Sequence, residues 1–271
     1  MARIHLTPDL PEAVRFTDVD LAINVVRRRG GSSTAQRLRR LAGDTKRVEV
    51  PIFTGLSLAI NPGEAVAVVP GSKDAGVVEL FRLASGTLVP DVGTVERQHH
   101  VIPMLTRSGL LNNSITVRQN IWVGALLLGM TPDQVRERFN WIVTFGGLEK
   151  ILDTYAKQVS PLMRRRVVWT VTMATQARSF AIQRSLVVGD QDFQDRCWEH
   201  LDGLKADGVT FLVETTDEML LRFCERGVVV GNGGVIADTT VEEALKLRRV
   251  DETEEAEIQQ EEAEDEDWQA E

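Results

Sequence analysis

The chain consists of short apolar runs that alternate with stretches in which apolar residues recur every three or four positions. The first pattern is typical of buried strands and the second of amphipathic helices. We predict strands over 14–21, 50–60, 65–69, 94–105, 179–188 and 209–214, and helices over 117–129, 132–146, 162–177, 193–207, 219–226 and 240–249. A hairpin is expected around Asn232-Gly233, because Asn-Gly supplies the positive φ that such turns need. Early strands followed by strand–helix alternation predict an α/β fold with a mixed sheet.

One strand–loop–helix stretch carries the strongest chemical signal. The apolar run 65–69 leads into a loop with Gly71 and Gly76, and a helical pattern follows. This spacing matches the phosphate-binding P-loop, G-x-x-x-x-G-K-[ST]. The next two positions are Val77 and Val78 where the motif has Lys and Ser or Thr. On this stretch alone, an ordinary strand–turn–helix is an equal alternative. The candidate loop comprises Gly71, Ser72, Lys73, Asp74, Ala75, Gly76, Val77 and Val78.

The two valines change what such a loop can bind. In a working P-loop the lysine neutralises the β- and γ-phosphates and the hydroxyl binds Mg²⁺. A valine does neither, and Asp74 adds a negative charge that repels a triphosphate. Each charge-assisted hydrogen bond lost is worth about 1.5–3 kcal/mol. We therefore expect no cofactor, with ATP and Mg²⁺ only if residual binding persists; rescue by Lys73 is a lesser alternative.

Composition and charge describe a globular chain with an acidic end. The 271 residues are 43% hydrophobic and 26% charged, as in ordinary soluble proteins. Residues 251–271 hold twelve acidic residues and no Lys or Arg, and leaving them out changes the net charge from −9 to +3. We expect a loose N-terminus over 1–13, a folded domain over 14–250 and a disordered acidic tail over 251–271. The sequence has neither a run long enough to span a bilayer nor a signal peptide, so a cytoplasmic location is expected.

Cysteine and histidine spacing gives no metal site. Cys197 and Cys224 belong to no C-x-x-C pair, so buried, reduced thiols are expected. The four histidines match no metal motif.

Three stretches, in the right order, resemble ATP-binding-cassette (ABC) transporter ATPase subunits of the subfamily that exports O-antigen, capsule or teichoic-acid polymers. These are LVVGDQDFQDRC at 186–197, NIWVGALLLGM at 120–130 and LASGTLVPDVG at 83–93. The resemblance covers about 14–249. It implies an ABC-type P-loop ATPase fold: a mixed sheet core, an antiparallel β subdomain, and a helical subdomain over about 105–178.

The same resemblance places the family's catalytic positions on unsuitable residues. The Walker B aspartate and the catalytic glutamate fall on Gln183 and Arg184, and the switch histidine on Thr215. The D-loop aspartate is kept as Asp190. The signature segment falls on Ser160, Pro161, Leu162 and Met163.

The resemblance implies a catalytically degenerate subunit of a polysaccharide or teichoic-acid exporter at the inner face of the membrane. Its partners would be a membrane permease subunit and either a second copy or an active ABC ATPase subunit, with no nucleic acid. A scaffold or regulator that uses the dimerisation surface without transport is the alternative, and an active ATPase with a deviant P-loop a lesser one. The permease is expected to dock at 106–116, near Leu110, Leu111 and Ile115, unless these residues fill the chain's own core.

Overall fold

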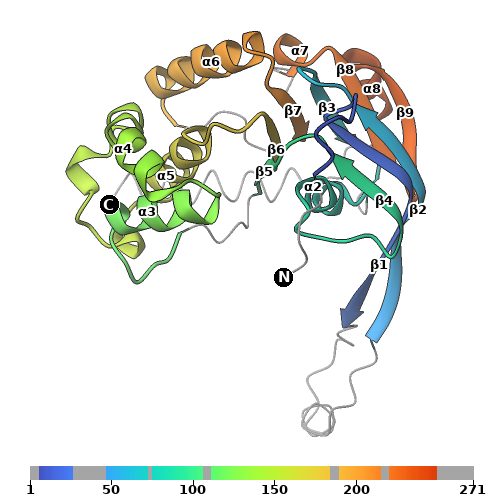
Figure 1. Cartoon of the computed structure of the whole chain (residues 1–271), viewed down its shortest axis with the longest axis horizontal. Coiled ribbons are helices and arrows are strands. Elements are labelled where there is room, and N and C mark those ends of the chain that lie inside the picture. Colours follow the sequence, from blue (N-terminus) through green and yellow to red (C-terminus); the bar gives the residue numbers. More distant parts are fainter. Residues whose placement is uncertain are drawn as a thin grey trace, which may run out of the picture.

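A six-stranded sheet in the order β5-β6-β7-β3-β8-β9 runs through the middle of the computed structural model (Figure 1). The structure describes residues 6–26, 47–72, 75–105, 111–183, 189–214 and 220–248. All neighbouring strands in this sheet are parallel except β9, which is antiparallel to β8. The strands are β3 (Ala65–Pro70), β5 (Val101–Met104), β6 (Ser179–Gln183), β7 (Thr210–Glu214), β8 (Arg226–Gly231) and β9 (Gly234–Thr240). The predicted mixed sheet is confirmed.

A second, antiparallel sheet has the order β2-β1-β4 and comprises β1 (Val14–Val26), β2 (Arg47–Ile60) and β4 (Val92–Arg97). Val14 and Phe16 of β1 are buried, and they pack with β2 residues against the central sheet and the helix α2 (Val77–Ser85). The stretch 94–105, predicted as continuous strand material, divides between the two sheets. β4 ends at Arg97, whose buried guanidinium donates to the carbonyls of Leu83, Ala84 and Val95.

The helices α3 (Val117–Leu127), α4 (Pro132–Gly146) and α5 (Pro161–Met173) form a separate lobe (Figure 1). Thr116 and Thr131 begin α3 and α4 with capping boxes. Two short 3₁₀ turns, Glu149–Ile151 and Ala156–Gln158, connect α4 to α5. The lobe has its own apolar core, which includes Ile121 and Ile142. The predicted helix 162–177 ends earlier, at Met173.

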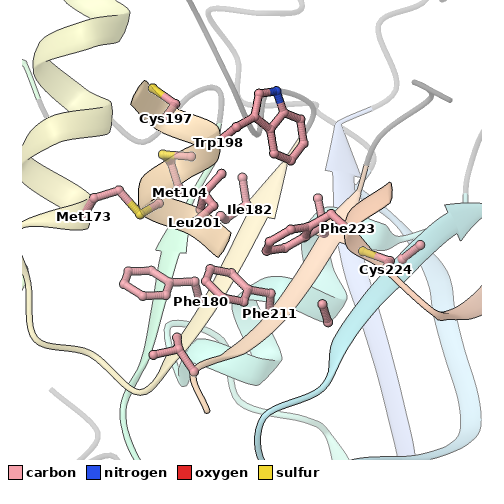
Figure 2. Close-up of a cluster of buried hydrophobic side chains, with 14 of the residues drawn as sticks. Met104, Met173, Phe180, Ile182, Cys197, Trp198, Leu201, Phe211, Phe223 and Cys224 are labelled. Atoms are coloured by element: carbon pink, nitrogen blue, oxygen red, sulfur yellow. The ribbon is translucent and has the colours of Figure 1, made fainter. Parts of the chain in front are cut away.

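The other face of the central sheet is covered by α6 (Gln191–Ala206), α7 (Leu220–Phe223) and α8 (Val241–Leu247). Phe180 and Phe211 stack at 5.6 Å between ring centroids, and Trp198 and Leu201 of α6 pack in the same cluster (Figure 2). The helix predicted at 219–226 is shorter than expected, because Arg226 already belongs to β8, where it pairs with Glu64 and Asp238.

Both cysteines are buried free thiols, as expected. Burial raises the pKa of the Cys224 thiol to about 12, so this thiol stays protonated and unreactive.

The ends of the described chain are packed locally. Residues 6–13 belong to the stretch expected to be loose, but Leu10 is buried and the backbone N–H of Ala13 donates to the carbonyl of Ile60. At the other end, Thr240 caps α8, and Asn232 has a φ of 51° in the predicted hairpin turn. Residues 27–46, a stretch rich in arginine, and the acidic tail 251–271 lie outside the described residues.

Candidate nucleotide site

The predicted P-loop follows β3, whose residues Val66 to Val69 are fully buried. The backbone N–H of Gly71 donates to the carbonyl of Val230, which fixes the start of the loop at the carboxyl end of the sheet. Gly76 has a φ of 73° and begins α2 without a side-chain cap. This left-handed conformation suits glycine, which has no Cβ to clash with the backbone. Lys73 and Asp74 lie outside the described residues.

The first turn of α2 is apolar. Val77 is buried in the core between the two sheets, and Val78 is half-buried. Glu79 is the acidic residue of this turn. The first two positions of the helix therefore present neither a cation for phosphate nor a hydroxyl for Mg²⁺.

Polar residues end β7, which pairs with the P-loop strand β3, and β6, which pairs with β7 on its other side. Gln183 ends β6 and Glu214 ends β7, and the two are register partners in the parallel ladder. Both are buried, and Glu214 also lies opposite Val68 of β3. The sequence analysis named Gln183 as a site position but did not name Glu214. An acidic residue at the end of an apolar strand pattern was a signal that could have pointed to Glu214. Arg184 and Thr215 lie outside the described residues.

The signature-equivalent segment forms an ordinary helix start. Ser160 caps α5 by accepting from the backbone N–H of Met163, and Pro161 occupies the first helical position. Proline is favoured at this position because it needs no hydrogen-bond acceptor there. Leu162 is half-buried, and Met163 packs against the core of the helical lobe. Pro161 therefore has no backbone N–H to offer a ligand, and Leu162 places a bulky side chain at the next position.

Asp190, at the start of α6, contacts α5, the helix that begins with the signature-equivalent segment. Its carboxylate accepts from the backbone N–H of Phe193 at 3.0 Å and pairs with Arg166 of α5. The Arg166 side chain is 9% exposed and the Asp190 side chain 64% exposed. The Phe193 N–H and then Arg166 hold the pKa of the Asp190 carboxyl below its ordinary value. The sequence analysis named Asp190 as the D-loop aspartate but did not name Arg166 as its partner.

An aromatic cluster connects the helical lobe to α6. The ring centroid of His200 on α6 lies 5.1 Å from that of Trp141 and 5.7 Å from that of Phe145, both on α4. It lies 6.0 Å from the ring centroid of Trp169 on α5. The pKa of His200 is lowered, chiefly by burial and further by the positive charge of Arg138, while a backbone hydrogen bond with Met173 opposes the shift. This cluster was not predicted, since nothing in local spacing brings the three helices together.

A groove of about 500 Å³ lies between the helical lobe and the central sheet. Its apolar wall includes Leu127, Leu128 and Met130 at the end of α3, and Ile102 of β5. Its polar residues include His100, Gln134, Glu137, Arg138 and Gln176. The Leu127 side chain is 71% exposed. In the stretch where a permease is expected to dock, Leu111 is half-buried and packs against the core of the helical lobe, and Leu110 lies outside the described residues.

The described residues hold neither a metal cluster nor a membrane span. No group of three or more His, Cys, Asp or Glu side chains among them could hold a metal ion. In this part of the chain, no helix has the length and apolar character that crossing a membrane requires.

Solved structures with the same architecture are ATP-binding cassettes. The dimeric cassette MJ0796, in a post-hydrolysis state bound to ADP and Pi, matches with a TM-score of 0.64 over 84% of this chain and 98% of that chain, at 16% identity. An ATP-binding subunit of an ABC transporter matches with a TM-score of 0.65 over 89% and 97% of the two chains, also at 16% identity. The fold is therefore that of an ABC ATPase cassette.

Sequence relatives narrow this class. The O-antigen export system ATP-binding protein RfbB of Klebsiella pneumoniae is 30% identical over 65% of this chain and 72% of its own length. The ABC transporter protein AbcA of Aeromonas salmonicida is 29% identical over 70% and 63% of the two lengths. The teichoic acids export ATP-binding protein TagH of Lactococcus lactis is 26% identical over 79% and 46%. No family model matches the chain.

The chain belongs to the family of ABC transporter ATP-binding proteins. Within this family it groups with proteins named for O-antigen and teichoic-acid export. It spans less than two thirds of the Aeromonas relative and about half of the Lactococcus relative.

The Asp190–Arg166 contact predicts a measurable loss of stability in Asp190→Asn. Asparagine keeps the helix cap but removes the counter-charge of a buried guanidinium, so we expect a loss of about 1–2 kcal/mol in the free energy of unfolding. Urea denaturation measures this loss. Asp192→Asn, in the same first turn but without the Arg166 contact, is the control. Equal small losses in both variants would mean that the pair contributes nothing.

His200 predicts a pH-dependent contribution to stability. Because its pKa in the folded state is below the ordinary value of 6.5, the neutral ring is favoured by folding. Its contribution is therefore complete above the unfolded pKa and is lost as the pH falls through the lower, folded pKa. The difference in unfolding free energy between the wild type and His200→Gln should be larger at about pH 7.5 than at about pH 5. Exposed His100→Gln is the control, and a difference that stays constant with pH would contradict the prediction.

Proposed function

We propose that this chain is an ATP-binding-type subunit of an ABC exporter for a cell-surface polysaccharide or teichoic-acid-like polymer. It acts by docking on a membrane permease, alongside a second copy or an active ATPase subunit, at the inner face of the membrane. It does not hydrolyse ATP itself. The names of the relatives support the export assignment.

The apolar first turn of α2 is the observation that carries the loss of hydrolysis. Phosphoryl transfer depends on positioned positive charge, because negative charge is spread over the phosphate oxygens in the transition state. The Val77 side chain is buried in the core and that of Val78 is half-buried, and both are uncharged, so neither position offers a positive charge. At the end of β6, the amide of Gln183 stands where the resemblance places a carboxylate for Mg²⁺.

The groove between the lobes supports the docking role. It presents apolar Leu127, Leu128 and Met130 beside polar Gln134 and Gln176. Apolar anchors with a polar rim suit an amphipathic helix, which lays one apolar face into a groove. Leu127 gives the clearest support for docking, because a leucine that is 71% exposed leaves a large apolar surface in water.

The purified chain should show no Mg²⁺-dependent ATP turnover above background. Loss of the lysine, the metal ligand and the base together removes many factors of ten in rate, at about 1.4 kcal/mol per factor. Release of inorganic phosphate measures the turnover. A Mg²⁺-dependent rate that disappears in Lys73→Ala would contradict the proposal and establish the rescue by Lys73.

Leu127→Asp should abolish co-purification with a membrane permease and leave the melting temperature nearly unchanged. The aspartate places a charge on the apolar wall of the groove, whereas the exposed position contributes little to the core. Leu247→Asp, on α8 and 52% exposed, is the matched control and should retain the permease. Expression of the wild type and of both variants in the source cells, followed by affinity purification in detergent, makes the comparison.

Two results would overturn the docking role. If the Leu127→Asp variant binds the permease as well as the wild type does, the groove is not part of the interface. A wild-type chain that retains no membrane protein, but self-associates or binds a soluble partner, would favour the scaffold or regulator instead.

A further inference from the structure

Arg138 of α4 lines the groove between the helical lobe and the central sheet, and its side chain is half-buried there. Among the described residues, no hydrogen bond or ion pair engages its guanidinium group. Other arginines of the lobe are paired: Arg136 with Asp133, and Arg118 of α3 with Asp153. Arg138 therefore brings into the groove a positive charge that no described residue neutralises by direct contact.

The other ionisable groups in the described part of the groove do not cancel this charge. Glu137 is exposed and forms no ion pair with Arg138, because consecutive residues of a helix point in different directions. His100, on the sheet side of the groove, is either neutral or positive. The groove thus has a cation on its α4 wall without a matching anion opposite.

The helical spacing of α4 fixes where this cation lies. Gln134, Arg138 and Trp141 are four and three positions apart, so they share one face of the helix. Gln134 lines the groove, and Trp141 packs on His200 in the aromatic cluster. Arg138 lies between the two, and its positive charge reaches His200, whose pKa it helps to lower.

A carboxylate is the group that best matches an unpaired guanidinium. The planar fork of arginine donates two parallel hydrogen bonds to the two carboxylate oxygens. The apolar residues Leu127, Leu128 and Met130 line the same groove. An amphipathic helix with an acidic residue at the edge of its apolar face would contact both features. A basic residue in that place would be repelled and would leave Arg138 without a counter-charge.

We propose that Arg138 selects the partner of the groove, and that this partner is an amphipathic helix of the permease with an Asp or Glu beside its apolar face. The inference rests on the proposed docking role and deepens it by naming the chemistry of the segment that docks. The leucines bind the apolar face, whereas Arg138 distinguishes among apolar segments by their charge.

Two synthetic peptides of equal length test this charge selection. Each has leucines at positions i, i+3, i+4 and i+7 of a helix, with either Glu or Lys at one position beside the leucine stripe. Fluorescence anisotropy gives the Kd of each peptide for the full chain and for the variants Arg138→Glu and Arg138→Gln. Arg136→Glu is the matched control, since Arg136 is on the same helix but is paired with Asp133. Leu127→Asp reports whether the peptides occupy the groove, and circular dichroism verifies that each variant is folded.

We expect the wild type to bind the Glu peptide at least about tenfold more tightly than the Lys peptide. Arg138→Glu should reverse this preference, Arg138→Gln should abolish it, and Arg136→Glu should keep it. Leu127→Asp should weaken the binding of both peptides. Added salt should reduce the preference of the wild type, because a half-buried ion pair is partly screened.

Three results would overturn the inference: equal Kd values of the two peptides for the wild type, a preference that survives in folded Arg138→Glu, or no binding of either peptide in the groove. The docking role is decided separately by the co-purification of the permease. If Leu127→Asp loses the permease while the peptides show no charge preference, docking stands and only the role of Arg138 falls.

Discussion

The rest of the structure depends on the burial of β3 between β7 and β8. Val66 and Val68 lie on one face of this strand and Val69 on the other, and all three are fully buried. A parallel strand with apolar residues on both faces is stable only when helices or a second sheet cover each face. Here α2 and the antiparallel sheet cover one face, and α6 to α8 cover the other. The start of the loop at Gly71 is thereby positioned by the strand, independently of the loop's side chains.

The position of Gly71 therefore does not depend on a lysine or a hydroxyl at the start of α2. Loop position is set by the strand and by the hydrogen bond from Gly71 to Val230, neither of which involves a phosphate-binding side chain. Val77 shows the consequence, since at this position a side chain that would serve a ligand contributes instead to the core. Burying a valine contributes about 1.5–3 kcal/mol. Val77 therefore adds to the stability of the fold at the position where the motif has its lysine.

Local patterns in the sequence were sufficient for most elements, whereas the features that the sequence analysis missed join distant residues. The Asn232-Gly233 hairpin and the Thr240 cap follow from chemistry within a few residues, and the structure agrees. By contrast, Ile52 meets Gly76 through strand packing, and Arg166 meets Asp190 across 24 positions. Spacing along the chain carries no information about such contacts. The family resemblance located Asp190 because it matched a motif residue by residue.

The groove and the Asp190 contact share one property: both lie where the helical lobe meets the sheet and its helices. Arg166 and His200 tie α5 and α4 to α6, so the lobe is held by an ion pair and an aromatic cluster as well as by the chain connections. A groove between two bodies keeps its shape only if the bodies keep their relative position. The contacts that fix the lobe therefore also preserve the groove. The apolar first turn of α2 and the contacts of the lobe are therefore independent features of the structure: a change in the one leaves the groove as it is.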